Sequence, residues 1–81
     1  MKARITITLK SGVLDPQGKA IANALGALGF DGVDGVRQGK YIELDLDESD
    51  PDRARDQIEC MCQKLLANTV IENYQFELEA A

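Results

Sequence analysis

The residues of this sequence that could do chemistry are few, and the most reactive are two cysteines, Cys60 and Cys62. On a helix, which we predict for this stretch, two positions turn by about 200°, so the two thiols point away from each other. They could not share a metal ion from one helical turn, and the sequence contains no histidine to activate either thiol as a nucleophile. We therefore interpret both cysteines as small apolar residues in a core.

An acidic run from Glu43 to Asp52 has the appearance of a calcium-binding loop. Oxygen-bearing side chains alternate along it at Asp45, Asp47 and Ser49. The sixth position of such a loop would be glycine and is Asp50, and the twelfth would be glutamate and is Asp56. A solvated strand end followed by a helix start explains the run better.

The glycines also fail to form a nucleotide-binding motif. Gly26, Gly29 and Gly32 do not match the dinucleotide fingerprint, and the sequence contains no P-loop pattern. Nothing in the spacing of the carboxylates indicates a buried pair with separated pKa values. We predict no catalytic residue, no cofactor-binding residue and no metal ligand in this chain.

Length and charge narrow the possible partners. The 81 residues predict one domain, over residues 1–81, with nine basic and fourteen acidic side chains and a net charge of −5. This balance disfavours nucleic acid, whose phosphates need clustered lysine and arginine. The sequence has no run of membrane-spanning length and no apolar signal region after Met1, so we expect a cytoplasmic protein and no membrane partner. Because so short a chain builds only a marginal core, we also expect a homo-oligomer, with a dimer as the unit.

Around these residues, periodicity predicts the elements of the first half. Ile5, Ile7 and Leu9 alternate with polar residues and predict a half-buried strand. Asp15 and Pro16 form a helix start, and an apolar stripe of Ile21, Ala24, Leu25 and Leu28 should face a sheet until Gly29 ends the helix. Val33 and Val36 mark a short second strand, and residues 38–40 read as a hairpin turn.

The second half of the chain repeats the order strand, Asp-Pro helix start, strand. A strand is predicted from Tyr41 to Asp47, with Ile42, Leu44 and Leu46 inward. Asp50-Pro51 starts a second helix, whose buried face we assign to Ala54, Ile58, Met61, Cys62 and Leu65. A last strand runs from about Val70 and begins late or bends, because Ile71 and Glu72 break its alternation.

The element order βαββαβ predicts an α+β fold, a split-βαβ, ferredoxin-like sandwich with a four-stranded antiparallel sheet and two helices on one face. The first strand would be central, placing Arg4 and Lys10 on the polar face. The acidic residues expected around them are Glu43, Asp45, Glu77 and Glu79. That face carries no stacking aromatic residues, unlike an RNA-binding sheet of this topology.

Three classes of function fit such a domain. An acylphosphatase would need an arginine in the first loop, residues 10–14, to hold a phosphate, and a metal chaperone would need a Cys-x-x-Cys there; the loop has neither. An interaction subunit needs surfaces rather than a site, which agrees with the residues present.

Ordered motifs along the chain resemble those of the PurS family. The segments that carry the resemblance are Val13–Gly18, Leu28–Phe30, Val36–Arg37, Gly39–Lys40, Glu43–Leu44, Leu65–Asn68, Val70–Glu72 and Tyr74. They cover nearly the whole chain; the departure is Thr69, where the family pattern leads us to expect proline.

The resemblance implies a role in purine biosynthesis. PurS is the small, non-catalytic subunit of a three-component phosphoribosylformylglycinamidine (FGAM) synthase. In that enzyme a synthetase subunit uses ATP and Mg²⁺, and a glutaminase subunit releases ammonia from glutamine. The family's dimer would bridge these two subunits and help ammonia transfer, and this chain would bind no cofactor itself.

We predict that partners contact two places, the start of the first helix and the predicted hairpin. The residues concerned are Asp15, Gln17, Gly18, Lys19, Arg37, Gly39 and Lys40. Both places combine exposed charge with a costly glycine. In the helix, Gly18 costs up to about 1 kcal/mol relative to alanine, and this cost suggests that another group approaches the backbone closely there. Tight turns with positive φ are the alternative explanation, about as good for Gly39 and less good for Gly18.

Overall fold

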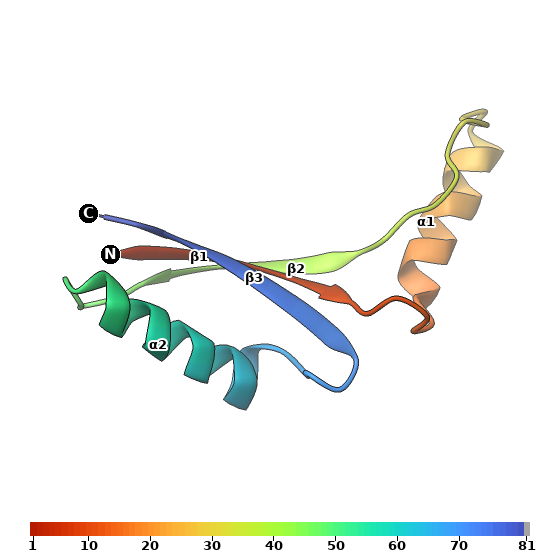
Figure 1. Ribbon diagram of the computed structural model, residues 1–81. Coiled ribbons are helices and arrows are strands. Elements are labelled where there is room, and N and C mark those ends of the chain that lie inside the picture. The colour runs from red at the N-terminus through yellow and green to blue at the C-terminus, as the bar shows by residue number, and fades with distance from the viewer. Residues whose placement is uncertain (81) are drawn as a thin grey trace.

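The computed structural model describes residues 1–80. β1 (Lys2–Leu9) leads to α1 (Pro16–Ala27), and then β2 (Gly39–Asp45) leads to α2 (Pro51–Met61). One π-helical turn, η1 (Cys62–Leu66), continues α2 before the last strand, β3 (Glu72–Glu79) (Figure 1). β3 begins at Glu72 rather than at Val70, so the prediction that this strand begins late is confirmed.

The strands form an antiparallel sheet in the order β2-β1-β3, so the predicted central position of β1 is confirmed. Ile5 pairs with Ile42 on one side and with Phe76 on the other. The sheet has three strands among the described residues, and the predicted fourth strand is wrong: residues 31–38 form a turn and an irregular segment. Gly32 and Gly35 weaken strand propensity there. The predicted hairpin at residues 38–40 is also wrong, because β2 begins at Gly39.

One face of the sheet is apolar and carries the core, as alternation predicts. Buried residues from β1, α2 and the following turn make up this core: Ala3, Ile5, Ile7, Ile58, Cys62 and Ala67. The inward side chains of β2 and β3 pack around them: Ile42, Leu44, Tyr74, Phe76 and Leu78. The opposite face is polar and uncovered.

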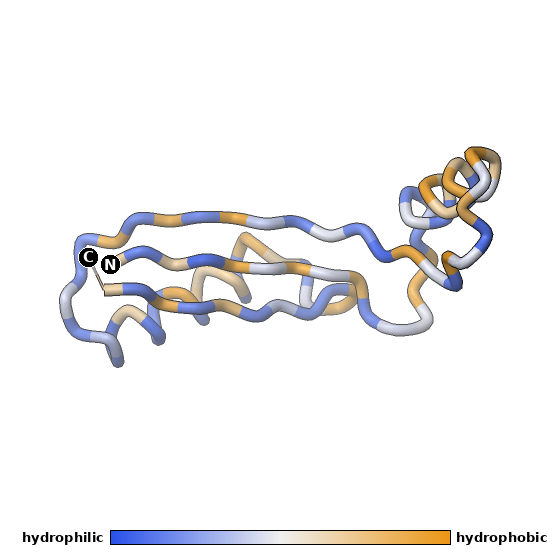
Figure 2. The backbone as a smooth tube through the Cα atoms, turned by 90° about the horizontal axis from the view of Figure 1, so that it is seen from above, coloured by the Kyte–Doolittle hydropathy of each residue, from blue (hydrophilic) through white to orange (hydrophobic). Residues whose placement is uncertain are grey.

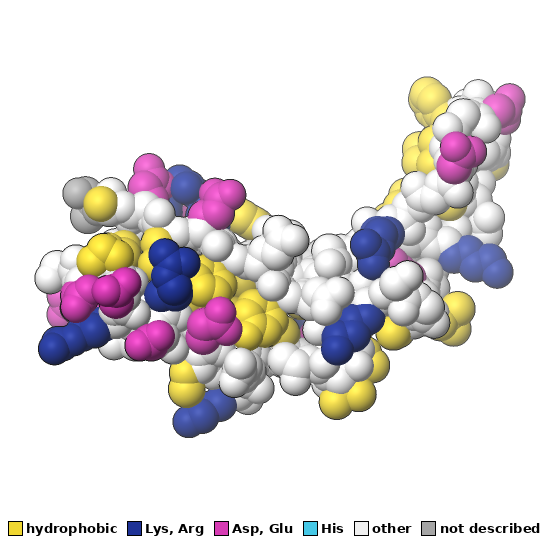
Figure 3. Space-filling view, in the orientation of Figure 1, with side chains coloured by type: hydrophobic (Ala, Val, Ile, Leu, Met, Phe, Trp, Pro, Cys, Tyr) yellow, Lys and Arg dark blue, Asp and Glu magenta, His cyan; other side chains and the backbone are white. Residues whose placement is uncertain are grey.

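α2 packs on the apolar face against β3, whereas α1 makes no comparable contact with any described strand. α1 stands beyond the end of the sheet, so the prediction of two helices on one face is wrong for this chain (Figures 1 and 2). Two of its predicted inward residues are open to solvent, with Ile21 41% and Leu28 72% exposed, and Leu25 is half-buried. Figure 3 shows hydrophobic side chains along one edge of this helix. The molecule is elongated, measuring 48 × 27 × 14 Å.

Both helices begin as their Asp-Pro pairs predict. Asp15 and Asp50 are the N-caps, and each is followed by proline at the first helical position. α1 ends with Gly29 at φ +96°, the left-handed conformation expected after a helix. The wider π-helical turn shifts the register after α2, so Leu66 packs on the core and Leu65 is 83% exposed, contrary to prediction.

Candidate functional site

Four segments meet at the end of the sheet nearest α1 and surround an open hollow of about 280 Å³. We call it the junction hollow, and its lining residues are Ile7, Leu9, Asp15, Pro16, Gln17, Gln38, Gly39, Lys40 and Glu72. They come from β1, the start of α1, the start of β2 and the start of β3. Four of the seven predicted contact residues, Asp15, Gln17, Gly39 and Lys40, therefore lie around one hollow.

Asp15 holds the start of α1 to the chain that leads into β2. Its Oδ1 accepts a hydrogen bond from the Gly18 amide at 2.8 Å, and its Oδ2 accepts one from the Gln38 amide at 3.1 Å. The hydrogen bonds from Gly18 and then Gln38, with the nearby charge of Arg37, hold the pKa of this carboxyl below its ordinary value. The ionised side chain of Asp15 thus links the two segments. Its N-cap signature predicts the hydrogen bond from Gly18 but not the one from Gln38.

The two glycines allow close backbone approaches. A Cβ on Gly18 would lie 2.5 Å from the carbonyl oxygen of Val36, and one on Gly39 would lie 2.3 Å from that of Ile7. The described residues with positive φ are Gly12 and Gly29, so the left-handed alternative is wrong for both. The close approach inferred for Gly18 is confirmed, and the group that approaches is this chain's own carbonyl.

The two predicted cations are tethered rather than projecting from a hairpin. Arg37 donates to the carbonyl oxygen of Leu9 at 2.6 Å, which holds residues 36–38 against the end of β1. Lys40 lies 3.7 Å from the carboxylate of Glu72, while its own side chain stays 63% exposed. Glu72 also accepts a hydrogen bond from the Asn68 amide at 2.7 Å, so it links the hollow to the chain entering β3. No sequence signal pointed to Glu72 as a lining residue.

Gln17 and Lys19 are the predicted contact residues that remain available. Both are exposed on the first turn of α1, and their side chains make no hydrogen bond or ion pair with another described residue. The Lys19 amide is used within the helix start, where it donates to the Asp15 carbonyl oxygen at 3.0 Å. A partner surface meeting this turn would find these two side chains uncommitted.

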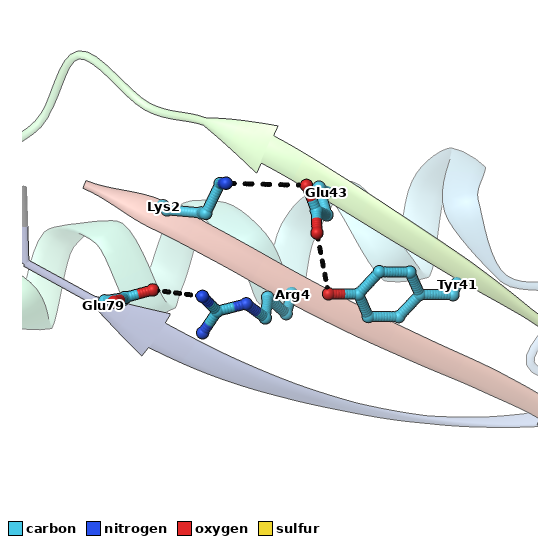
Figure 4. A network of polar contacts seen from close by, with 5 residues as sticks. All are labelled: Lys2, Arg4, Tyr41, Glu43 and Glu79. Carbon is cyan, nitrogen blue, oxygen red and sulfur yellow. Dashed lines mark hydrogen bonds and ion pairs between the residues drawn. The ribbon is translucent and has the colours of Figure 1, made fainter.

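A second polar cluster crosses the uncovered face of the sheet (Figure 4). Arg4 pairs with Glu79, as the strand order predicts, and this carboxylate raises the pKa of the guanidinium. Lys2 lies 3.5 Å from Glu43, and the Tyr41 hydroxyl donates to the same carboxylate at 2.9 Å. The tyrosine and then the lysine lower the pKa of Glu43. These exposed pairs hold the strands in register rather than forming a reactive centre.

Other expected partners of this cluster do not join it. Lys10 lies beyond the end of β1, where its amide donates to the Ile71 carbonyl oxygen. Within the described part of the chain, Asp45 and Glu77 form no ion pair.

The two cysteines point apart, as predicted, but they differ in burial. Cys62 is fully buried in the core, and burial raises the pKa of its thiol. Cys60 is exposed, so its predicted place in the core is wrong. Residues 1–80 contain no group of three or more side chains of the types that hold a metal ion, and no helix among them is long and apolar enough to cross a membrane.

Comparison with known proteins identifies the family of this chain. The family model described as PurS, phosphoribosylformylglycinamidine (FGAM) synthase, matches residues 2–80. The chain belongs to the PurS family. A PurS relative from Synechocystis is 56% identical over 95% of this chain and 77% of its own length. The solved PurS of Methanocaldococcus jannaschii superposes with a TM-score of 0.88 at 41% identity, covering 99% of this chain and 96% of that one.

The resemblance read from the sequence motifs is therefore confirmed. A PurS chain in the solved PurLQS structure of Thermotoga maritima is also similar, with a TM-score of 0.86 at 30% identity, over 94% of this chain and 93% of that one. Because the PurS likenesses cover almost the full length, they include α1 and the junction hollow.

Proposed function

We propose that this chain is the non-catalytic small subunit of FGAM synthase in purine biosynthesis, joining the synthetase subunit to the glutaminase subunit and helping ammonia transfer. The observation that carries the proposal is the likeness over 94% of the chain to a protein in the PurLQS structure. The junction hollow is open, and the polar contacts beside it link segments of the chain rather than forming reactive pairs, which agrees with a docking role.

The chain itself is proposed to hold no cofactor or metal, and ATP and Mg²⁺ would be used by the synthetase partner. A net charge of −5 supports protein partners rather than nucleic acid. The family match over residues 2–80 supports a single domain over residues 1–81, and two free cysteines support a cytoplasmic setting. The small core supports a homodimer or a higher homo-oligomer.

Docking is proposed to use the start of α1, with Gln17 and Lys19 as the side chains that a partner meets first. Asp15, Gly18 and Gly39 contribute by fixing the backbone beneath them, and Arg37 and Lys40 by tethering the chain into β2.

Reconstitution tests the proposal. The synthetase and glutaminase subunits from the same organism are assayed for FGAM formation with glutamine or with ammonia, with and without this chain. Glutamine-dependent synthesis should require the chain, ammonia-dependent synthesis should proceed without it, and the tagged chain should capture both subunits. The pure chain should release no ammonia from glutamine and hydrolyse no ATP. Glutamine-dependent synthesis at an unchanged rate without the chain would overturn the proposal.

A further inference from the structure

Unpaired positive charge gathers at one hollow, although the net charge of the chain is −5. Four of the nine basic residues form ion pairs: Lys2, Arg4, Lys40 and Arg53. Lys10 and Arg37 form none with a described residue, and both line an open hollow of about 470 Å³ beside the loop that follows β1. We call it the loop hollow. Its two cations are available to hold an anion.

The fold fixes the positions of both cations. The Nη2 group of Arg37 donates to the Leu9 carbonyl oxygen at 2.6 Å, which brings this arginine to the end of β1. A guanidinium has five N–H donors, so four of them remain for a ligand. Lys10 is anchored by its amide, which donates to the Ile71 carbonyl oxygen at 2.8 Å. Because these positions are set in advance, an anion that binds here pays little to order the chain.

The loop between β1 and α1 adds further donors. A hydrogen bond of 3.1 Å from the Val13 amide to the Lys10 carbonyl oxygen closes it as a turn, with Gly12 at φ +87°. Among residues 1–80, the amides of Ser11 and Gly12 have no backbone acceptor. The exposed side chain of Ser11 adds a hydroxyl group. Backbone and side-chain donors therefore lie beside the two cations.

Asp15 is the acidic residue that lines the loop hollow, and it leaves the hollow positive. Its two oxygens already accept hydrogen bonds from the amides of Gly18 and Gln38. Against its single negative charge stand the charges of Lys10 and Arg37. The lining thus combines a net positive charge with donors from a guanidinium, an ammonium group and a turn.

We propose that the loop hollow binds the phosphate group of a small phosphomonoester, with Arg37 and Lys10 holding its oxygens. A phosphate carries a charge of about −1.5 to −2 at neutral pH and three acceptor oxygens, more than a carboxylate offers to these donors. The planar fork of Arg37 can hold two of the oxygens at once. The volume of the hollow falls within the range of small-molecule sites, about 300–1,000 Å³.

This inference also changes how the first loop is understood. Residues 10–14 contain no arginine, which counted against a phosphate site, and the structure brings one to the loop from residue 37. We infer binding and not hydrolysis, because both oxygens of the carboxylate in the lining are bound to amides. The inference goes beyond the proposed function and needs neither partner subunit.

A titration of the isotope-labelled chain, followed by NMR at constant ionic strength, tests the inference. The probes are ribose 5-phosphate, inorganic phosphate, ribose and acetate. Both phosphates should give saturable shifts of the Ser11 and Gly12 amides and of the Arg37 side chain, whereas ribose and acetate should not. Tighter binding of ribose 5-phosphate would assign the site to sugar phosphates, and equal binding would assign it to the phosphate group alone.

A variant and a matched control measure the part that charge plays. Lys10→Gln should weaken phosphate binding about tenfold or more, because it removes a charge-assisted hydrogen bond. Lys64→Gln makes the same change at an exposed lysine of η1, away from the loop hollow, and should bind as the wild-type chain does. The melting temperatures of both variants show whether they fold.

Three results would overturn the inference. They are shifts no larger with phosphate than with acetate, shifts spread over the whole chain, and unchanged phosphate binding by folded Lys10→Gln. If Lys10→Gln does not fold, the shifts of the unaltered chain decide. Equal, saturable binding of acetate would show that the loop hollow accepts carboxylates, such as the acidic side chains of a protein, rather than phosphate in particular. Failure of this test leaves the bridging role standing, and failure of the reconstitution leaves the phosphate site standing.

Discussion

At the scale of single residues, Asp15 ties together two segments that are more than twenty positions apart. Replacing it by asparagine removes the charge and leaves one carbonyl oxygen for the two amides of Gly18 and Gln38. We expect a lower melting temperature and less helical ellipticity at pH 7. The matched control is Asp56→Asn, an exposed aspartate on α2, which should leave both unchanged.

The pH dependence of this effect has a defined sign. The hydrogen bonds lower the pKa of Asp15 in the folded state, so its stabilisation is present above the ordinary aspartate pKa of about 3.9 and is lost as pH falls through the folded value. The difference in melting temperature between the wild-type chain and Asp15→Asn should therefore shrink in acid. A difference that stays constant from pH 7 to acid would contradict the role of the carboxylate.

Gly39 is the second residue whose role can be tested alone. A Cβ there would lie 2.3 Å from the Ile7 carbonyl oxygen, inside the pairing of β1 with β2. We expect Gly39→Ala to lower the free energy of unfolding by about 1–3 kcal/mol, because backbone must move to admit the methyl group. Gly26→Ala is the control: apart from the neighbouring residues and the backbone of its own helix, no described atom lies within 4 Å of that Cβ, and alanine should raise stability or leave it unchanged. Chemical denaturation of the three proteins measures this, and equal midpoints would refute it.

At the scale of the elements, α2 and the η1 turn that continues it supply the helical cover for the sheet within residues 1–80, and Ile58 is the fully buried anchor of α2. Shortening this side chain with Ile58→Val should cost about 0.5–1.5 kcal/mol of unfolding free energy. Arg55→Ala, on the exposed side of the same helix, should change it by less than about 0.5 kcal/mol. Denaturant titration distinguishes the two, and equal losses would show that α2 is not the cover that the core depends on.

The elements also show how far the sequence predicts this fold. Alternation locates β1, β2 and β3, and the Asp-Pro pairs give both helix starts, because each of these signals is local. The position of α1 is not predicted, since an apolar stripe shows that a face must be covered but not which surface covers it. The π-helical turn after α2 is equally invisible, and it moves Leu65 out and Leu66 in.

The sequence points to several residues around the junction hollow but not to the contacts that they make within the chain. Costly glycines and charges drew attention to Asp15, Gly18 and Gly39, and the structure brings their segments together at the junction hollow. The cost of the two glycines is explained by close contacts within the chain. These contacts join segments that are far apart in the sequence, so no local sequence pattern predicts them. Glu72 was missed for the same reason.

At the scale of the whole molecule, these internal roles decide how docking should be tested. Reversing Arg37 or Lys40 would break the tie to Leu9 or the pair with Glu72, so lost binding could follow from lost structure. Lys19 is exposed and makes no ion pair with a described residue. Lys19→Glu is therefore the cleaner reversal.

We expect Lys19→Glu to keep the melting temperature and the oligomeric mass of the wild-type chain, and to capture less of the synthetase or glutaminase subunit in a pull-down. A charge at the rim of an interface acts mainly on association rate, so the loss should be larger at low salt than at moderate salt. Arg55→Glu is the matched control, because it makes the same change of charge on the exposed side of α2, away from the junction hollow. If both variants capture both partners as the wild-type chain does at each salt concentration, the start of α1 is not a docking surface. Equal losses from both variants would mean that the net charge of the chain, rather than this turn, attracts the partners.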